Sequence, residues 1–276
     1  MLIIEAIVLG IIQGLTEFIP VSSSAHLIAI PKMLGWRDLG LSFDVALHAG
    51  TLVALLAYFW KDWVRIISEF CAHIFKGEPY AKAAAGEPSG KLLVPIIIAC
   101  IPAAIVGKLW DKKIESDFRN LLLISITLIV VSIIMLLAER AGKKQRGIDR
   151  LNMVDYIVIG LAQALALVPG VSRSGITITA GLFRNMDRAS AARFSFLLST
   201  PIIFGAALLK LKDVMKTGLP QGEVMVFAVG VATAALVGYL AIRFLMNYLK
   251  EKTLGVFIAY RIAFAVLIAG VFFLKK

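Results

Sequence analysis

The chain has 276 residues, of which 59% are hydrophobic, and its mean hydropathy is +0.87. A single water-solvated core cannot bury that much apolar surface, so a soluble globular protein is excluded. The formal net charge is +11. The lysines and arginines lie mainly in predicted loops, where they set membrane topology, so nucleic acid is not an expected partner. Two lone cysteines, Cys71 and Cys100, predict neither a disulfide framework nor a zinc site.

Ten helical segments are predicted, because an apolar segment that crosses a bilayer satisfies its backbone only as a helix. In chain order they cover about residues 2–18, 22–34, 44–60, 92–110, 121–139, 152–168, 172–183, 189–211, 223–249 and 254–274. A basic, amphipathic stretch that later contains Gly and Pro follows the third, and a charged linker follows the fifth. The second and seventh segments are shorter than the roughly 20 residues that a spanning helix needs. Each follows a proline-interrupted segment, so each pair predicts a re-entrant hairpin.

The two halves of the chain repeat. Gly10-Ile-Ile-Gln13 is echoed by Gly160-Leu-Ala-Gln163, and Val21-Ser-Ser-Ser24 by Val171-Ser-Arg-Ser174, each 150 residues downstream. Each repeat, about 1–140 and about 152–276, is expected to hold one hairpin and three transmembrane helices, and an odd number of crossings inverts the second copy. We therefore expect an all-α polytopic membrane protein, one integral domain over residues 1–276, with a site between two inverted repeats near the midplane.

Loop charges indicate how the chain lies in its membrane. The predicted inner loops carry more Lys and Arg than the predicted outer loops, which cover residues 31–43, 110–120 and 210–222. This bias places the N-terminus and the first hairpin at the outer face.

The first polar cluster lies in the first hairpin and reads Gln13-Gly-Leu-Thr-Glu17-Phe-Ile-Pro-Val-Ser22-Ser23-Ser24-Ala-His26. Gln13 and Glu17 are four residues apart and share one helix face. The hydroxyl groups can cap the second helix, whose free N–H groups attract anions. An ionisable residue in an apolar segment marks a functional site. Structural alternatives are an interhelical hydrogen bond for Glu17, plain capping for the serines, and an interface role for His26.

The second polar cluster lies in the second hairpin and reads Pro169-Gly170-Val171-Ser172-Arg173-Ser174-Gly175-Ile176-Thr177. Gly170 lets the backbone turn or approach a ligand closely. Ser172 or Ser174 can cap the following helix. Arg173 presents a planar fork suited to phosphate oxygens. A buried arginine beside a helix N-terminus needs an anionic partner. Glu17 is one such partner, and a phosphate group would satisfy all these donors together.

Together the clusters contain the parts of a phosphoryl-transfer site. Hydroxyls, backbone N–H groups and a guanidinium bind anions, while a carboxylate beside an amide can hold a divalent cation. A histidine can transfer protons or attack, so the set favours metal-assisted phosphoryl transfer. Asp44 and His48, one turn apart on the third helix, are expected to support the site or the fold rather than to act on a substrate.

These two motifs resemble those of the undecaprenyl-diphosphatase family, the bacitracin-resistance type of bacterial membrane phosphatase, and the resemblance extends over essentially the whole chain. It implies hydrolysis of undecaprenyl diphosphate to the monophosphate and inorganic phosphate. The reaction would take place at the outer (periplasmic) face of the bacterial cytoplasmic membrane and recycle the lipid carrier of peptidoglycan synthesis. The resemblance also implies a divalent cation, Mg²⁺ or Ca²⁺.

Carried over to this chain, the resemblance makes Glu17 the essential metal-linked acid and Arg173 the group that holds the diphosphate. Ser23 and His26 become candidates for attack or proton transfer, with water as a third attacking group. The expected substrate contacts are Gln13, Ser22, Ser24, Gly170, Ser172, Ser174 and Thr177. The family often has Glu where this chain has Gln13, so Glu17 is the only carboxylate of the motif here. Metal affinity would then rest partly on substrate oxygens.

Other functions fit parts of the pattern. Inverted repeats are a transporter architecture, so a transporter or flippase for a polyprenyl phosphate or another organic anion is the alternative. Anion transport needs only the arginine and the helix ends, so the added Glu, Ser and His favour the enzyme. A purely structural membrane protein leaves the polar clusters unexplained. Membrane lipids are the expected surroundings, and a homodimer is possible.

Overall fold

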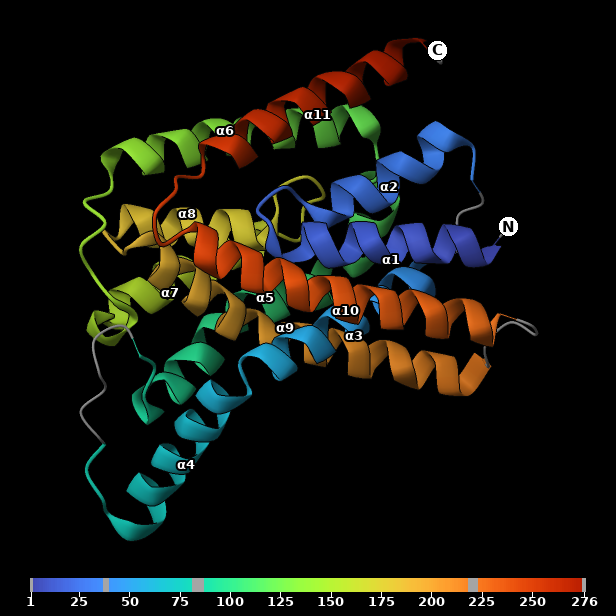
Figure 1. Ribbon diagram of the computed structural model, residues 1–276. Coiled ribbons are helices and arrows are strands. Elements are labelled where there is room, and N and C mark those ends of the chain that lie inside the picture. Colours follow the sequence, from blue (N-terminus) through green and yellow to red (C-terminus); the bar gives the residue numbers. More distant parts are fainter. Residues whose placement is uncertain (1, 37–39, 81–86, 218–222, 275–276) are drawn as a thin grey trace.

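A computed structural model describes residues 2–36, 40–80, 87–217 and 223–274 of the chain. The regular elements of this part are all helices, and loops connect them (Figure 1). Its α-helices are α1 (Leu2–Phe18), α2 (Ser23–Leu34), α3 (Gly40–Tyr58), α4 (Trp60–Lys76), α5 (Leu93–Asp117), α6 (Leu121–Ala141), α7 (Met153–Leu165), α8 (Arg173–Phe183), α9 (Arg188–Thr217), α10 (Val224–Tyr248) and α11 (Gly255–Leu274), with 3₁₀ turns at Gly90–Leu92 and Ile148–Arg150.

Length and apolar composition identify the membrane-crossing segments. Five qualify: Gly90–Trp110, Leu121–Ala141, Arg188–Leu209, Val224–Tyr248 and Gly255–Leu274. The bent pair α3 and α4, with an angle of 70° between its two parts, is a sixth if it counts as one span. Large apolar side chains on these helices face outward, as on α6 at Ile126, Val130 and Ile133. Such surfaces suit lipid rather than water, and the expected class, an all-α polytopic membrane protein, is confirmed.

The helix ranges differ from the expected ones in a few places. The described chain has eleven α-helices instead of ten, because the amphipathic stretch after the third segment forms α4. The expected helix 152–168 ends at Leu165, since the N–H groups of Leu167 and Val168 bond to carbonyls three residues back. Helices α5 and α9 continue to Asp117 and Thr217, beyond their expected ends at 110 and 211. The expected outer loops 31–43 and 210–222 lie partly outside the described residues.

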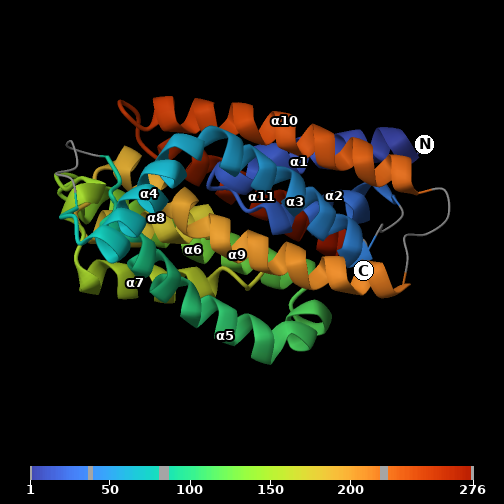
Figure 2. The same cartoon turned by 90° about the horizontal axis from the view of Figure 1, so that it is seen from below.

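The two short hairpins, α1–α2 and α7–α8, enter the bundle from opposite ends, and their connecting loops meet near its middle (Figures 1 and 2). Helix α1 packs against α10, and α7 packs against α5. The first helix of each hairpin is thus held by a helix from the other half of the chain. This packing of each hairpin against the other half of the chain brings the two loops, 150 residues apart in sequence, into the same region.

Glycine residues allow α1 and α10 to approach closely. A Cβ on Gly10 would lie 2.8 Å from the carbonyl oxygen of Gly230, and one on Gly14 would lie 2.8 Å from the backbone nitrogen of Gly238. Small residues four apart are the usual means by which membrane helices pack backbone to backbone. Gln13 and Glu17 lie next to these glycines on α1, and Glu17 meets the second hairpin there.

Each hairpin turns at a serine with unusual backbone geometry. Ser22 has φ 78° and Ser172 has φ 73°, and each side chain caps the following helix by accepting from the N–H three residues on, at 3.4 Å for Ala25 and 3.1 Å for Gly175. The expected caps of both short helices are therefore confirmed. A positive φ costs an L-residue roughly 1–2 kcal/mol, so surrounding contacts must hold both turns in place.

Replacing Gly170 with alanine is expected to destabilise the second hairpin. Gly170 has φ 93°, and an added Cβ would lie 2.0 Å from Oγ1 of Thr127, whose hydroxyl donates to the Pro169 carbonyl at 2.8 Å. The backbone strain alone is worth about 1–3 kcal/mol. The melting temperature of the detergent-purified variant should fall. The matched control is Gly270→Ala, in helix α11, where an added Cβ meets nothing within 4 Å and the melting temperature should not fall. Equal melting temperatures for the two variants would contradict this account.

Candidate active site

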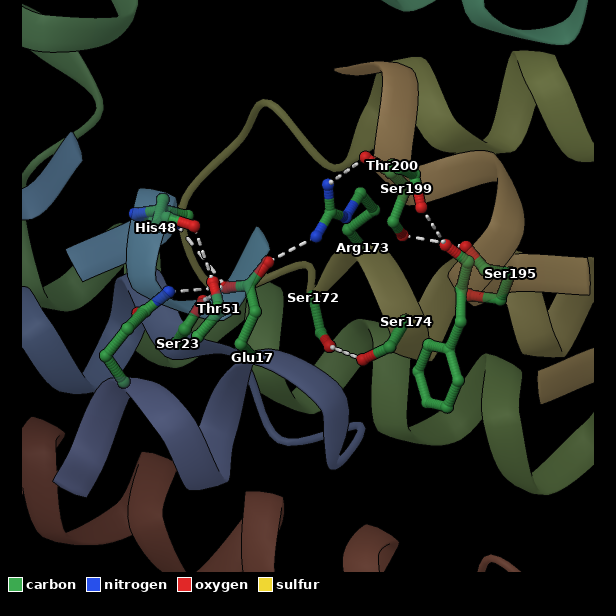
Figure 3. A network of polar contacts seen from close by, with 12 residues as sticks. Glu17, Ser23, His48, Thr51, Ser172, Arg173, Ser174, Ser195, Ser199 and Thr200 are labelled. Carbon is green, nitrogen blue, oxygen red and sulfur yellow. Dashed lines mark hydrogen bonds and ion pairs between the residues drawn. The ribbon is translucent and has the colours of Figure 1, made fainter. Parts of the chain in front are cut away.

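Glu17 is the centre of a buried polar cluster between the two hairpins (Figure 3). It lies in the last turn of α1, just before the chain breaks at Pro20. Its Oε2 accepts hydrogen bonds from Gln13 Nε2 at 3.0 Å and from the hydroxyl of Ser23 at 2.7 Å. Its Oε1 forms an ion pair with the guanidinium of Arg173. One carboxylate therefore joins the first turn of α2 to the first turn of α8, as the repeat pattern predicts.

Arg173 is the first residue of α8 and retains an unused donor. Its Nη2 is paired with Glu17, and its Nη1 donates to the Ser199 carbonyl at 3.5 Å. Its Nε is buried and has no hydrogen-bond partner among the described residues. The same holds for Oε1 of Gln13.

The ion pair is also what a purely structural role for Glu17 would produce. If the ion pair were only structural, the buried donor on Arg173 and the buried acceptor on Gln13 should have hydrogen-bond partners, because native proteins pair such atoms. The unused Arg173 Nε and Gln13 Oε1 therefore favour a ligand that carries oxygen atoms and either a proton or a cation.

Helix α3 also contributes a side chain, His48, to the polar cluster between the two hairpins. Its Nε2 lies 3.4 Å from Glu17 Oε2, and its Nδ1 donates to the Asp44 carbonyl at 2.7 Å. This contact agrees with the supporting role expected for the two residues. The His48 side chain is 32% exposed, against 14% for Arg173 and 5% for Glu17, so the cluster is most open along His48.

His26 lies on a different side of the first hairpin from Ser23. Its Nδ1 donates to the Ser22 carbonyl at 2.7 Å, so its Nε2 accepts from the hydroxyl of Tyr260, at 2.8 Å. Its ring stacks on Phe264 with the centroids 4.0 Å apart. Both ring nitrogens are thus used, and no contact found within the described chain joins His26 to Glu17. Of the two expected candidates for attack, only Ser23 touches the carboxylate.

The remaining hydroxyl groups bond mostly to the hairpins themselves. Ser24 contacts Ser22 at 3.2 Å and accepts from the N–H of Gly170 at 3.4 Å, which ties one loop to the other. Ser172 and Ser174 contact each other at 3.3 Å.

Thr177 is held in the same way, since it donates to the Arg173 carbonyl at 2.7 Å and lies 2.6 Å from Oγ of Ser195. The structure therefore gives these side chains a role in shaping the loops, and their contact with a substrate stays a prediction.

A divalent cation fits the oxygen donors at Glu17. No group of three or more His, Cys, Asp or Glu side chains suited to a metal ion occurs among the described residues. Near Glu17, however, lies the unpartnered Oε1 of Gln13. Mg²⁺ and Ca²⁺ prefer oxygen ligands, and Mg²⁺ commonly keeps several waters and takes the rest of its shell from substrate phosphates. One carboxylate with one amide oxygen is therefore an adequate protein contribution, although the cation stays a prediction.

Two residues at the site were not anticipated from the sequence. Tyr260 bonds to His26, and the neighbouring Arg261 bonds to both hairpin loops. The signal for Arg261 was present, because it is an ionisable residue in the middle of the apolar segment 254–274. What the segment did not reveal was which other helices this arginine would meet.

Two broken helices bring a carboxylate, a serine, an arginine and two helix N-termini together inside the bundle, and helix N-termini favour an anion. With the apolar spans around them, they define a polytopic membrane protein with a buried polar site. Residues 6–267 match the family described as "Bacitracin resistance protein BacA". The chain belongs to this family.

Curated relatives cover nearly the whole chain, and each bears the name undecaprenyl-diphosphatase. One from Moorella thermoacetica is 49% identical over 277 residues and covers 100% of both chains. One from Geotalea daltonii is 47% identical over 262 residues, or 94% of each chain. One from Thermodesulfovibrio yellowstonii is 47% identical over 274 residues, covering 99% of this chain and 98% of the relative.

Proposed function

We propose that this protein is an undecaprenyl-diphosphate phosphatase, which hydrolyses undecaprenyl diphosphate to undecaprenyl phosphate and inorganic phosphate. Its family and the shared name of its relatives support this activity. The observation that carries the proposal is the carboxylate of Glu17, which contacts Ser23 of the first hairpin and Arg173 of the second. The reaction would return the lipid carrier to peptidoglycan synthesis.

The diphosphate binds where the two hairpin loops meet. Helices α2 and α8 both begin there, so their first N–H groups and their positive dipole ends favour an anion. Arg173 exchanges its ion pair with Glu17 for two phosphate oxygens, using the Nε that is otherwise unpartnered. The prenyl chain extends along the outward-facing apolar surface among the lipids.

Ser23 is the attacking group in this proposal. Its Oγ forms a bond to the terminal phosphorus while the bond from phosphorus to the bridging oxygen breaks, and its proton passes to Glu17, 2.7 Å away. Glu17 gives this proton to the departing undecaprenyl phosphate. It then takes a proton from a water molecule that attacks the phosphoserine and passes this proton to the departing Oγ of Ser23, which releases phosphate and restores both residues. His26 orients the first hairpin through the Ser22 carbonyl.

When a divalent cation is bound, Glu17 and the amide oxygen of Gln13 hold it, and it neutralises negative charge on the phosphate groups. Removing the cation with a chelator should therefore slow the reaction without unfolding the protein.

The same charge pattern that indicates topology supports a periplasmic opening in a bacterial inner membrane. The α6–α7 and α10–α11 connections lie at one end of the bundle, opposite the N-terminus (Figure 1). They carry the basic residues Lys143, Lys144, Arg146, Arg150, Lys250 and Lys252, and Arg140 lies in the last turn of α6 beside them. Such loops remain on the cytoplasmic side, so the end at which the first hairpin enters faces outward.

Phosphate release tests the proposed function directly. The purified protein is incubated with a polyprenyl diphosphate in detergent, with Mg²⁺ or Ca²⁺ and then with a chelator. We expect release of one phosphate per lipid, lost with the chelator and restored by the cation. Absence of release with either cation would refute the proposal.

Replacing Ser23 with alanine is expected to lower kcat by about a thousandfold, because the chain loses its nucleophile, while the helix cap at Ser22 stays intact. Ser125→Ala on α6 is the matched control, since the one partner of its buried hydroxyl among the described residues is the Leu121 carbonyl. Rapid quenching with a substrate labelled in its terminal phosphate should give a labelled peptide containing Ser23. Label on His26, or full activity of the Ser23 variant, would contradict the assignment.

A second function, movement of a polyprenyl phosphate across the membrane, is favoured by one observation: the two hairpins enter from opposite ends and share one site (Figures 1 and 2). Proteoliposomes loaded with polyprenyl phosphate in one leaflet would reveal it. Lipid movement without any phosphate release would make the protein a flippase instead of an enzyme.

A further inference from the structure

Arg261 lies in the middle of α11 and is the largest fully buried side chain of the described residues, at 0% exposure. Its guanidinium donates to acceptors on three parts of the chain. Nε donates to Oγ of Ser132 at 3.0 Å, on helix α6. Nη1 donates to the carbonyl of Pro20 at 3.4 Å, in the first hairpin loop. Nη2 donates to the carbonyls of Gly170 at 2.9 Å and Val171 at 3.3 Å, in the second loop.

The two loops present equivalent carbonyls to this one side chain. Pro20 and Gly170 occupy the same place in the two repeats, 150 residues apart. Each stands two residues before a serine with positive φ, Ser22 or Ser172. Both strained turns are thus held from the same side by one planar group. Arginine is suited to this role because its donors spread in a fixed plane, whereas the lysine ammonium is a single point.

Packing alone does not explain an arginine at this position. A buried cation in a membrane protein is costly, and none of the acceptors named above is a carboxylate that would balance its charge. An apolar side chain would fill the same space between α11 and α6 at lower cost. Residues of this kind are kept for function, and here the function must involve the loops that Arg261 touches.

We propose that Arg261 is a positioning residue that clamps the two hairpin loops together, so that the N-termini of α2 and α8 can bind the same phosphate group. By occupying the carbonyls of Pro20, Gly170 and Val171, it fixes the orientation of the peptide groups that lead into both caps. The adjacent Tyr260 reinforces the first loop, since its hydroxyl donates to His26, which itself holds the Ser22 carbonyl. This inference rests on the proposed phosphatase function.

The test compares Arg261→Lys and Arg261→Met with the unaltered protein. Because misplacing a catalytic group by about 1 Å can cost roughly a hundredfold, we expect kcat of Arg261→Met to fall by about that factor. KM should rise as well, because Arg173 keeps its contact with the substrate but the two helix N-termini no longer share one phosphate group. Arg261→Lys keeps the charge but reaches only one loop, so kcat should fall by about tenfold and the affinity for inorganic phosphate should weaken.

Two controls separate clamping from general stability. Arg243→Met removes an exposed arginine of α10 and should leave kcat unchanged. Ser132→Ala removes one of two contacts with α6, because the Leu128 carbonyl also accepts from Nη2 of Arg261. The bonds to both loops persist, so kcat should stay within about threefold. All rates are expressed per folded molecule, with the folded fraction taken from thermal unfolding.

Wild-type kcat and wild-type phosphate affinity in folded Arg261→Lys would overturn the clamp, even if Arg261→Met does not fold. An unaltered protein that releases no phosphate would refute the proposed function instead. Inorganic phosphate affinity, measured by calorimetry, would then decide the role of Arg261 by itself: weaker binding in Arg261→Lys supports the clamp, and equal binding refutes it.

Discussion

Arg173→Met is expected to lower kcat by about a thousandfold, the largest loss from any single cation of the chain. Among the described residues, Arg173 is the one guanidinium that touches Glu17, and its buried Nε has no partner there and is available for a phosphate oxygen. In phosphoryl transfer an arginine that neutralises transition-state charge is worth about 10³–10⁵ in rate. The rate of phosphate release at saturating substrate, with Mg²⁺ present, is the measurement.

Two further variants show whether this loss reflects phosphate binding by the guanidinium. Arg173→Lys keeps one positive charge but cannot form two parallel hydrogen bonds, so its loss should be smaller than that of the methionine variant. Arg150→Met serves as the control, because that side chain is 70% exposed and lies in the charged linker. Methionine and lysine variants with the activity of the unaltered protein would show that Arg173 serves only as a structural partner of Glu17.

Glu17→Gln is expected to lower kcat by about 10³–10⁴-fold. The substitution is nearly isosteric, yet it removes the proton acceptor of Ser23, which is also the carboxylate that accepts from Gln13. General base catalysis alone contributes about 10²–10⁴. The same change should raise the cation concentration needed for half-maximal activity, because an amide binds Mg²⁺ or Ca²⁺ less well than a carboxylate. Phosphate release across a cation titration measures both effects.

Glu5→Gln is the matched control for Glu17, since Glu5 is a buried acid on the same helix, three turns nearer the N-terminus. Its rate and cation requirement should equal those of the unaltered protein. Glu17→Gln also leaves Arg173 buried without a counter-charge, so its melting temperature should fall. If the loss of rate only matched the loss of folded protein, Glu17 would have a structural role and no part in the reaction.

The sequence by itself determined the class of the protein and most of its helices. The lengths of the apolar runs identified the spans, and Pro20 and Pro169-Gly170 marked the breaks. The serine clusters at 22–24 and at 172 and 174 predicted helix caps, and the structure assigns the caps to Ser22 and Ser172. These features are local, since run length, proline and caps act within one or two turns of a helix. The repeated motifs also predicted that Glu17 and Arg173 lie close together, and their ion pair confirms this.

Only the tertiary structure decided which side chains meet within that interface. It turned His26 toward Tyr260 and away from the carboxylate, placed His48 against Glu17, and set Arg261 between the two loops. These contacts join residues that are mostly far apart in the chain, and they depend on how each helix is rotated about its axis and which neighbour it packs against. In an apolar helix surrounded by lipid, hydrophobic periodicity does not specify that rotation, because lipid-facing and protein-facing positions are equally apolar.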